Sequence, residues 1–443
     1  MDYKELSQQL VDRCLKKGAS AAEVYLEIRR DLSVRVRNGD VETVQQSSGH
    51  GVGFRVFVGG RLGFAHCNSL SDGALDQALG TAISFAGRMT ADENNVLPDD
   101  RRVTEVAGLS DPKLGEVGMQ SKIELIKRTE QLALADPQAS KSGGASYGET
   151  ELEIYIANSN GIAKDFRSTA CRYSVSVVAE KGDQKSNGGE SCARRYYADL
   201  LPPEVVAAEA VRRAAEMLDP RVIKTQRAAV IFAPEAADAL LGGILGAVNG
   251  ENVLQGASFL REKLGQKIGA PDLTLIDDGT RPKGMSSRPF DGEGIPTQNR
   301  VIVDRGVLRG FLYNTSVAKR AGTQSTGNAS RGGYDSLPGI GAHLFYMAAG
   351  TGDPAEIIRA TRKGLFVKGV TGYGINAVNG NLSGGARGFW IENGASVFPV
   401  KDLTIAGTAD EILNAIDLIG KDLDVDRYSA PTFRIKEMQI GGA

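Results

Sequence analysis

Residues 226–248 read QRAAVIFAPEAADALLGGILGAV and open a distinctive stretch that continues to Arg331. The run Ala228–Phe232 is apolar enough for a buried strand. Pro234 follows closely, and proline is tolerated in the first turn of a helix because the N–H that it lacks would be unpaired there. We therefore predict a strand that leads directly into a helix over Ala237–Val248.

The remainder of this stretch alternates short apolar runs with turn residues. From Leu273 to Arg331 it reads LTLIDDGTRPKGMSSRPFDGEGIPTQNRVIVDRGVLRGFLYNTSVAKRAGTQSTGNASR. Glycine, aspartate and proline interrupt the apolar runs, which predicts strands joined by turns. Polar side chains gather in those turns, and loops carried on a sheet often hold binding residues.

The residues before this stretch predict helices and antiparallel strands. Alternating apolar residues on both sides of the turn Asn38-Gly39-Asp40 indicate a hairpin or meander, and residues 52–58 continue the alternation. Residues 90–120 are rich in Asp, Asn, Pro and Gly, which predicts a long connection. Helical periodicity predicts helices over residues 3–17, 70–89, 121–135 and 202–218.

The residues after it predict a helix over 353–364, a strand over 365–370 and a glycine-rich loop over 371–388. A hairpin across Asn393-Gly394, a last helix over 408–420 and a last strand over 431–440 follow. Because strands and helices occur in blocks, the predicted fold class is α+β. We predict two domains. Residues 1–221 form a domain of mixed helices and strands, with a connection between two subdomains near residues 90–120. Residues 222–443 form a domain built on antiparallel sheet with flanking helices.

Composition indicates an ordinary soluble protein of 443 residues. Hydrophobic residues make up 41% and charged residues 24%, and the net charge of −2 gives no electrostatic reason to expect nucleic acid or an anionic membrane as a partner. No apolar run approaches the roughly 20 residues of a membrane span, and the first residues lack the apolar core of a signal peptide. We expect a cytoplasmic protein, in which the four scattered cysteines are small buried side chains.

Four motifs resemble those of the TldD/PmbA peptidase family. They are SRPFDGEGIPT (residues 287–297), DRGVLRGFL (304–312), STGNA (325–329) and WIENG (390–394). GASAAEVYLE and GVGFRVFVGGRLGFAH in the amino-terminal half also fit, so the resemblance covers nearly the whole chain. It implies the two-domain fold of that family and a paired-subunit enzyme that acts on small peptides and unfolded segments.

The chain departs from the metal-bearing subunit of that family at its metal motif. That subunit carries Leu-Leu-His-Glu-x-x-Gly-His, in which two imidazoles bind zinc and the carboxylate acts on metal-bound water, and a cysteine near the carboxyl end is the third ligand. Here the run is Leu240–Ala247, with Gly242 and Ala247 at the histidine positions and Gly243 at the glutamate position. No cysteine follows Cys192.

The resemblance therefore implies the PmbA type of subunit, also called TldE, with no catalytic residue, no metal and no cofactor of its own. The expected partner is a TldD-like paralogue that holds the zinc, in a heterodimer, or a second copy of this chain in a homodimer. The expected substrate is a peptide. We interpret Asp291 and Glu293 as organisers of their own glycine turn that pair with Arg288. A substrate contact is the alternative, and these three residues with Asn328 form our candidate substrate groove.

Other kinds of site have weaker support in the sequence. His50, His66 and His343 lie far apart with no second ligand at helical spacing, so we interpret them as structural or surface histidines. Asp277 and Asp278 with the acidic turn could suggest a hard-cation site, but the spacing of a calcium loop is missing. Nucleotide-binding glycine motifs and a serine nucleophile motif are also missing.

Three hypotheses of different classes follow. The chain is a subunit of a peptidase complex, a homodimeric peptide-binding or regulatory protein, or an autonomous hydrolase with an unrecognised nucleophile. The family resemblance favours the first, and the missing ligands argue against the third. A paralogue with His-Glu-x-x-x-His would separate the first two.

Overall fold

The computed structural model of the chain describes residues 2–372, 374–425 and 429–442. Its α-helices are α1 (Tyr3–Lys16), α2 (Asp72–Ala86), α3 (Met119–Ala135), α4 (Pro203–Ala215), α5 (Asp238–Ala247), α6 (Gly250–Leu254), α7 (Thr315–Arg320), α8 (Pro354–Arg359) and α9 (Ala409–Asn414). The first half contributes strands β1 (Ala21–Arg37), β2 (Asp40–Val58), β3 (Arg61–Cys67), β4 (Lys141–Asn158), β5 (Ala163–Lys181) and β6 (Gln184–Arg194).

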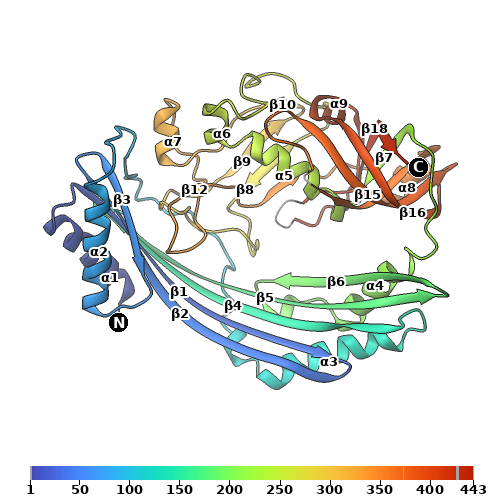
Figure 1. The fold of residues 1–443 in the computed structure, drawn as a ribbon, viewed down its shortest axis with the longest axis horizontal. Helices are drawn as coiled ribbons and strands as arrows, with labels where there is room; N and C mark the ends of the chain where they lie inside the picture. Colours follow the sequence, from blue (N-terminus) through green and yellow to red (C-terminus); the bar gives the residue numbers. More distant parts are fainter. Residues whose placement is uncertain (1, 373, 426–428, 443) are drawn as a thin grey trace.

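Strands β1 to β6 form one antiparallel sheet in the order β3-β2-β1-β4-β5-β6. The strands are long and curved, and the sheet forms a trough beneath the second half of the chain (Figure 1). Alternate residues of β1 are apolar and point to the face of the sheet that the helices cover. Val24 and Leu26 pack with α1 and α2, and Val34 and Val36 pack with α3 and α4. The residues between them point toward the concave face.

The second half contains a six-stranded sheet and a smaller four-stranded one. Their strand orders are β16-β15-β14-β7-β18-β17 and β10-β9-β8-β13. Strands β7 and β14 pair in parallel, and the other neighbouring strands in these two sheets pair antiparallel. The larger sheet consists of β7 (Gln226–Phe232), β14 (Lys363–Thr371), β15 (Asn381–Glu392), β16 (Ala395–Thr408), β17 (Ile416–Ile419) and β18 (Phe433–Gly441). The smaller one consists of β8 (Leu275–Asp278), β9 (Asn299–Asp304), β10 (Val307–Leu308) and β13 (Phe345–Met347), and β11 (Ala329–Ser330) pairs with β12 (Gly339–Ile340).

The α+β class and the predicted strand-to-helix passage are confirmed. Strand β7 leads through a single turn at Pro234–Ala236 into α5, and one buried cluster joins both to the two sheets. The predicted hairpins across Asn38-Gly39 and Asn393-Gly394 are also present. All four of these turn residues have positive φ, as this kind of tight turn requires. Across the helices of the described residues, none is long and apolar enough to cross a membrane.

Some predicted elements are wrong in their extent. The helix predicted over 353–364 ends at Arg359, and β14 begins at Lys363. Residues 381–388 of the glycine-rich loop predicted over 371–388 are strand instead, because β15 begins at Asn381. Gly388 is needed for close pairing there: a Cβ at this position would lie 1.9 Å from the Phe366 carbonyl oxygen. The last helix is only α9, since Ile416–Ile419 forms β17 and pairs with β18 instead of continuing the helix. Tyr373, within the predicted loop, lies outside the described residues.

Candidate functional site

Helix α5 contains Gly242, Gly243 and Ala247, the three positions at which the family resemblance predicts a degenerate metal motif. Gly242 is exposed with open space around it, whereas a Cβ on Gly243 would lie 2.1 Å from the carbonyl oxygen of Ile375. Ala247 on the same helix is fully buried in the main core of the second half. The helix therefore serves close packing, and the three positions offer no side-chain donor.

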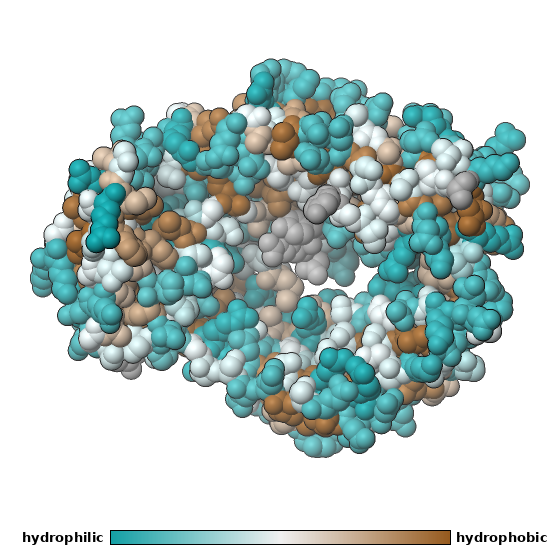
Figure 2. All heavy atoms as spheres, viewed as in Figure 1, coloured by the Kyte–Doolittle hydropathy of each residue, from teal (hydrophilic) through white to brown (hydrophobic). Residues whose placement is uncertain are grey.

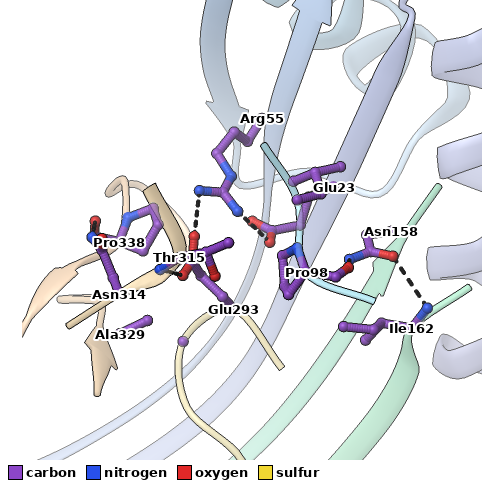
Figure 3. A network of polar contacts seen from close by, with 12 residues as sticks. Glu23, Arg55, Pro98, Asn158, Ile162, Glu293, Asn314, Thr315, Ala329 and Pro338 are labelled. Carbon is purple, nitrogen blue, oxygen red and sulfur yellow. Dashed lines mark hydrogen bonds and ion pairs between the residues drawn. The ribbon is translucent and has the colours of Figure 1, made fainter. Parts of the chain in front are cut away.

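A buried network of charges joins the two halves of the chain (Figure 3). The Arg55 guanidinium on β2 lies between Glu23 on β1, at 2.7 Å, and Glu293 in the second half, at 2.8 Å. The side chain of Arg331 pairs with the other oxygen of Glu23 and donates to the Gly292 carbonyl at 2.7 Å. Glu293 also accepts a hydrogen bond from the backbone N–H of Thr315 at 2.8 Å.

Burial and charge act in opposite directions on Glu293, which is 0% exposed. Burial acts to raise the pKa of its carboxyl, but the charge of Arg55 and the hydrogen bonds from Thr315 outweigh burial and leave the pKa below its ordinary value. Glu293 is therefore a charged structural group that ties the second half to the first-half sheet.

Asp291 organises the turn in which it lies, as the sequence predicted. Its Oδ1 accepts from the N–H groups of Glu293 at 2.8 Å and Ile295 at 2.9 Å, and its Oδ2 accepts from Ala329 at 2.9 Å. Burial and the nearby charge of Glu293 raise the pKa of Asp291. The expected pairing with Arg288 is wrong for both acids, because Arg55 pairs with Glu293 and backbone amides surround Asp291.

Asn328 lies in a second buried polar group, beside β8. Its amide donates to Asp277 at 2.6 Å and to the Gly341 carbonyl at 3.1 Å. The backbone N–H of His343 donates to the other oxygen of Asp277 at 2.7 Å. Burial raises the pKa of Asp277 to about 7. Burial and the charge of Arg288 lower the pKa of His343 to about 4, so this histidine is neutral and its Nε2–H donates to the Gly327 carbonyl at 2.7 Å.

The four residues of the candidate groove thus have different environments. Asp291, Glu293 and Asn328 are at most 1% exposed and their polar atoms are engaged inside the protein. Arg288 is half-buried and makes no ion pair in the described part of the chain. The sequence did not reveal Glu23, Arg55 and Arg331 as members of this network; their alternation in strands and turns carries no signal of contacts across such separations.

The histidines do not form a cluster. His343 is buried as described above, whereas His50 and His66 lie on β2 and β3 near Tyr334, whose ring meets that of His66 edge-on at 5.9 Å. Over residues 2–372, 374–425 and 429–442, no three His, Cys, Asp or Glu side chains are grouped to hold a metal ion.

Comparison with known proteins finds one family along the chain. Residues 22–86 match domain 1 of the PmbA/TldA metallopeptidases, residues 112–218 match the central domain and residues 225–442 match the carboxyl-terminal domain.

Individual proteins of this family are similar to the chain over most of its length. Metalloprotease PmbA of Escherichia coli O157:H7 is 31% identical, with 97% of this chain and 94% of that protein covered. A metalloprotease TldD homologue of Haemophilus influenzae is 24% identical, with 95% and 92% covered. The crystal structure of TldE from Thermococcus kodakarensis superimposes with a TM-score of 0.90 at 25% identity and covers 98% of this chain and 99% of that one. The chain therefore belongs to the PmbA/TldD metallopeptidase family.

Proposed function

We propose that this chain is the metal-free subunit of a TldD/TldE-type peptidase that acts on small or unfolded peptides. A paralogue with His-Glu-x-x-x-His supplies the zinc and the base, and this chain pairs with it and helps to enclose the peptide. In this proposal the chain contributes contacts and shape, and the paralogue breaks the bond.

The donor set of α5 carries the proposal. Zinc in proteins is held by imidazole nitrogen, thiolate sulfur or carboxylate oxygen, and Gly242, Gly243 and Ala247 have none of these. The Ile375 carbonyl also fills the space into which a side chain at position 243 would extend. The residues present therefore do not fit a zinc ion, and every cysteine of the chain precedes residue 193.

The concave face of the first-half sheet supports a role in enclosing peptide. An opening separates this sheet from the second half, and hydrophilic side chains border much of it (Figure 2). A cavity of about 420 Å3 on the sheet is lined by the serines at positions 146, 174, 176 and 191. Hydroxyl groups both donate and accept hydrogen bonds, so they can meet a peptide backbone of any sequence.

We propose Arg288 as the substrate contact of the candidate groove, because it is a half-buried cation without an acidic partner in the described residues. Asp291, Glu293 and Asn328 are then the residues that build the wall behind it. We further propose a domain boundary near residue 222, between the end of α4 at Ala215 and the start of β7 at Gln226.

Metal analysis of the purified chain after dialysis tests the proposed function. We expect far less than one zinc per chain, because α5 provides neither ligand nor base. A single tightly held zinc per chain would overturn the proposal, and a TldD-like paralogue prepared in parallel provides the positive control.

A further inference from the structure

Strand β2 has a long stretch with no neighbouring strand on one side. It pairs with β1 along nearly its whole length, from Asp40 to Phe57, whereas β3 pairs only with residues 52–58. Within the described residues no other strand pairs with residues 40–51. Figure 1 shows β2 as the outermost long strand, along the lower rim of the trough. Residues 40–50 are all exposed, so this free edge faces solvent.

The turn between β2 and β3 determines which main-chain groups of β2 face outward. Gly59-Gly60 is a two-residue turn with positive φ at both positions. Residues that flank such a turn pair through both their N–H and C=O groups, so Val58 bonds to β3. The Phe57 carbonyl points the other way and accepts from the N–H of Ser20, just before β1, at 2.8 Å. Odd-numbered residues therefore face β1, and even-numbered residues face the opposite side.

The same alternation continues beyond the end of β3. The register of β2 with β1 has no irregularity from Thr43 to Phe57. The N–H and C=O groups of Val44, Gln46 and Ser48 therefore point to the free edge, and no group of the described residues bonds to them. They recur at every second residue, as the donors and acceptors of an added strand would.

This edge lacks the devices that usually protect a sheet from pairing with other chains. Natural edges are protected by charged side chains, proline or bulges. Residues 43–51 read TVQQSSGHG, with no proline and no aspartate, glutamate, lysine or arginine. The irregularity in the pairing of β2 lies at Glu42, before this run. At the opposite edge of the same sheet, β6 carries Lys185, Glu190 and Arg194.

Two exposed valines lie beside the free edge. In the register with β1, Val41 is opposite Val36 and Val44 is opposite Val34, so both valines of β2 point to the face that the helices cover. Val34 and Val36 are fully buried, but Val41 is 41% and Val44 is 49% exposed. The helices thus stop short of the edge, and a chain added there would shield these valines from water.

We propose that two copies of this chain pair edge to edge through β2, antiparallel about a two-fold axis at Gln45, and form one continuous sheet. The axis is perpendicular to the sheet, so opposite side chains share a face and Gln45 meets its own counterpart. Val44 and Gln46 exchange about four main-chain hydrogen bonds with the second copy. Thr43 lies opposite Ser47 of the second copy, and none of these pairs sets like charges opposite each other.

The end of β3 selects this register. Its last residue, Cys67, pairs with Val52. An axis nearer to Val52 would drive the second copy's turn at Asn38-Gly39 into β3, whereas an axis at Gln45 keeps that turn short of it. The pairing goes beyond the proposed function, because it uses an edge outside the trough and does not depend on the paralogue.

Charges at the two-fold position test the proposal by analytical ultracentrifugation. We expect the wild-type chain to dimerise and Gln45→Lys or Gln45→Glu to associate roughly fivefold more weakly, since like charges then lie opposite each other. An equimolar mixture of the two variants should recover the dimer, because each lysine meets a glutamate. Gln184→Lys and Gln184→Glu, at an exposed position of β6, are matched controls that should leave the dissociation constant unchanged.

A cysteine at the same position tests the register. Opposite residues that do not bond to each other have Cα atoms about 4.5 Å apart, within the range of a disulfide. We expect mild oxidation to convert Gln45→Cys to a covalent dimer at least about fivefold faster than Gln46→Cys, which lies opposite Val44 of the second copy. Wild type oxidised in parallel shows what the native cysteines contribute, and thermal melting checks that each variant is folded.

A wild-type chain that stays monomeric at its highest soluble concentration would overturn the proposal, as would a dimer that charges at Gln45 leave unchanged. A monomeric wild type whose Gln45→Lys variant binds a TldD-like paralogue more weakly would place the paralogue at this edge, and would equally contradict pairing between like copies. Metal content and reconstitution test the proposed function separately.

Discussion

Buried charges contribute to the contact between the two halves of the chain, beside an apolar cluster around Phe290. Glu293 is 0% exposed and pairs with Arg55, which also pairs with Glu23. Removing one partner of a buried ion pair leaves the other charge uncompensated and typically costs about 3 to 5 kcal/mol. We expect Glu293→Gln to lower the free energy of unfolding by about 3 kcal/mol, the lower end of this range, because Glu23 still pairs with Arg55.

Urea unfolding followed by circular dichroism measures this effect. The matched control is Glu356→Gln on α8, whose carboxylate is largely exposed. We expect that change to alter the free energy of unfolding by about 0.5 kcal/mol or less. Equal effects of the two substitutions would contradict the structural role given to the buried network.

Asp277 provides a prediction about pH. Burial raises its pKa in the folded chain from 3.8 to about 7. Between these values the folded state holds a proton that the unfolded state releases, so the contribution of this group to stability decreases as pH rises. The maximum slope for one proton is about 1.4 kcal/mol per pH unit.

Comparison of wild type with Asp277→Asn isolates this contribution. We expect the wild type to lose stability relative to the variant as pH rises from about 4.5 to 7, because asparagine cannot ionise. The measurement is the difference in unfolding free energy at the two pH values. A difference that stays constant would show that Asp277 is not protonated in the folded chain.

At the scale of elements, two adjacent glycines of α5 have different surroundings. A Cβ at Gly243 would lie 2.1 Å from the backbone oxygen of Ile375, whereas Gly242 has open space around it. Gly243→Ala should therefore destabilise the chain by about 1 to 3 kcal/mol through overpacking. Gly242→Ala should instead stabilise it by roughly 0.5 to 1 kcal/mol, because alanine favours a helix more than glycine does.

Thermal unfolding of the two single variants distinguishes the positions directly. Opposite shifts in melting temperature are expected. If both variants are stabilised, the contact between α5 and Ile375 is looser than described, and the space for a side chain at position 243 is larger.

Periodicity was enough to predict many elements, but not their partners. The helices over the first half and the Asn-Gly hairpins follow from local pattern, and the structure has them. The glycines of β15 misled the prediction, since they resemble a loop but serve close pairing with β14. Glu23 and Arg331 meet across 308 residues, and no local rule predicts such a contact.

In the candidate groove, too, local sequence predicts a turn but not the contacts that its side chains make with distant residues. The motif that contains Asp291 and Glu293 was recognisable, and the turn around Asp291 was predicted correctly. Glu293 pairs with Arg55 and not with Arg288. This pairing depends on how the first-half sheet packs against the second half. Local sequence carries no information about that packing.

At the scale of the whole molecule, the chain combines a long curved sheet in its first half with a second half in which α5 packs closely against the chain at Ile375 (Figure 1). The proposed division of labour follows from this combination. In this proposal, this chain supplies the shape that surrounds a peptide, and the paralogue supplies the chemistry.

Reconstitution tests this division most directly. The rate of cleavage of a quenched fluorescent peptide is measured for this chain alone, for a His-Glu-x-x-x-His paralogue alone and for mixtures in which this chain is titrated against a fixed amount of the paralogue. We predict no cleavage by this chain alone and a rate that rises and saturates near one chain per paralogue, abolished by a zinc chelator. Zinc-dependent cleavage by this chain alone, unchanged when the paralogue is added, would contradict the account.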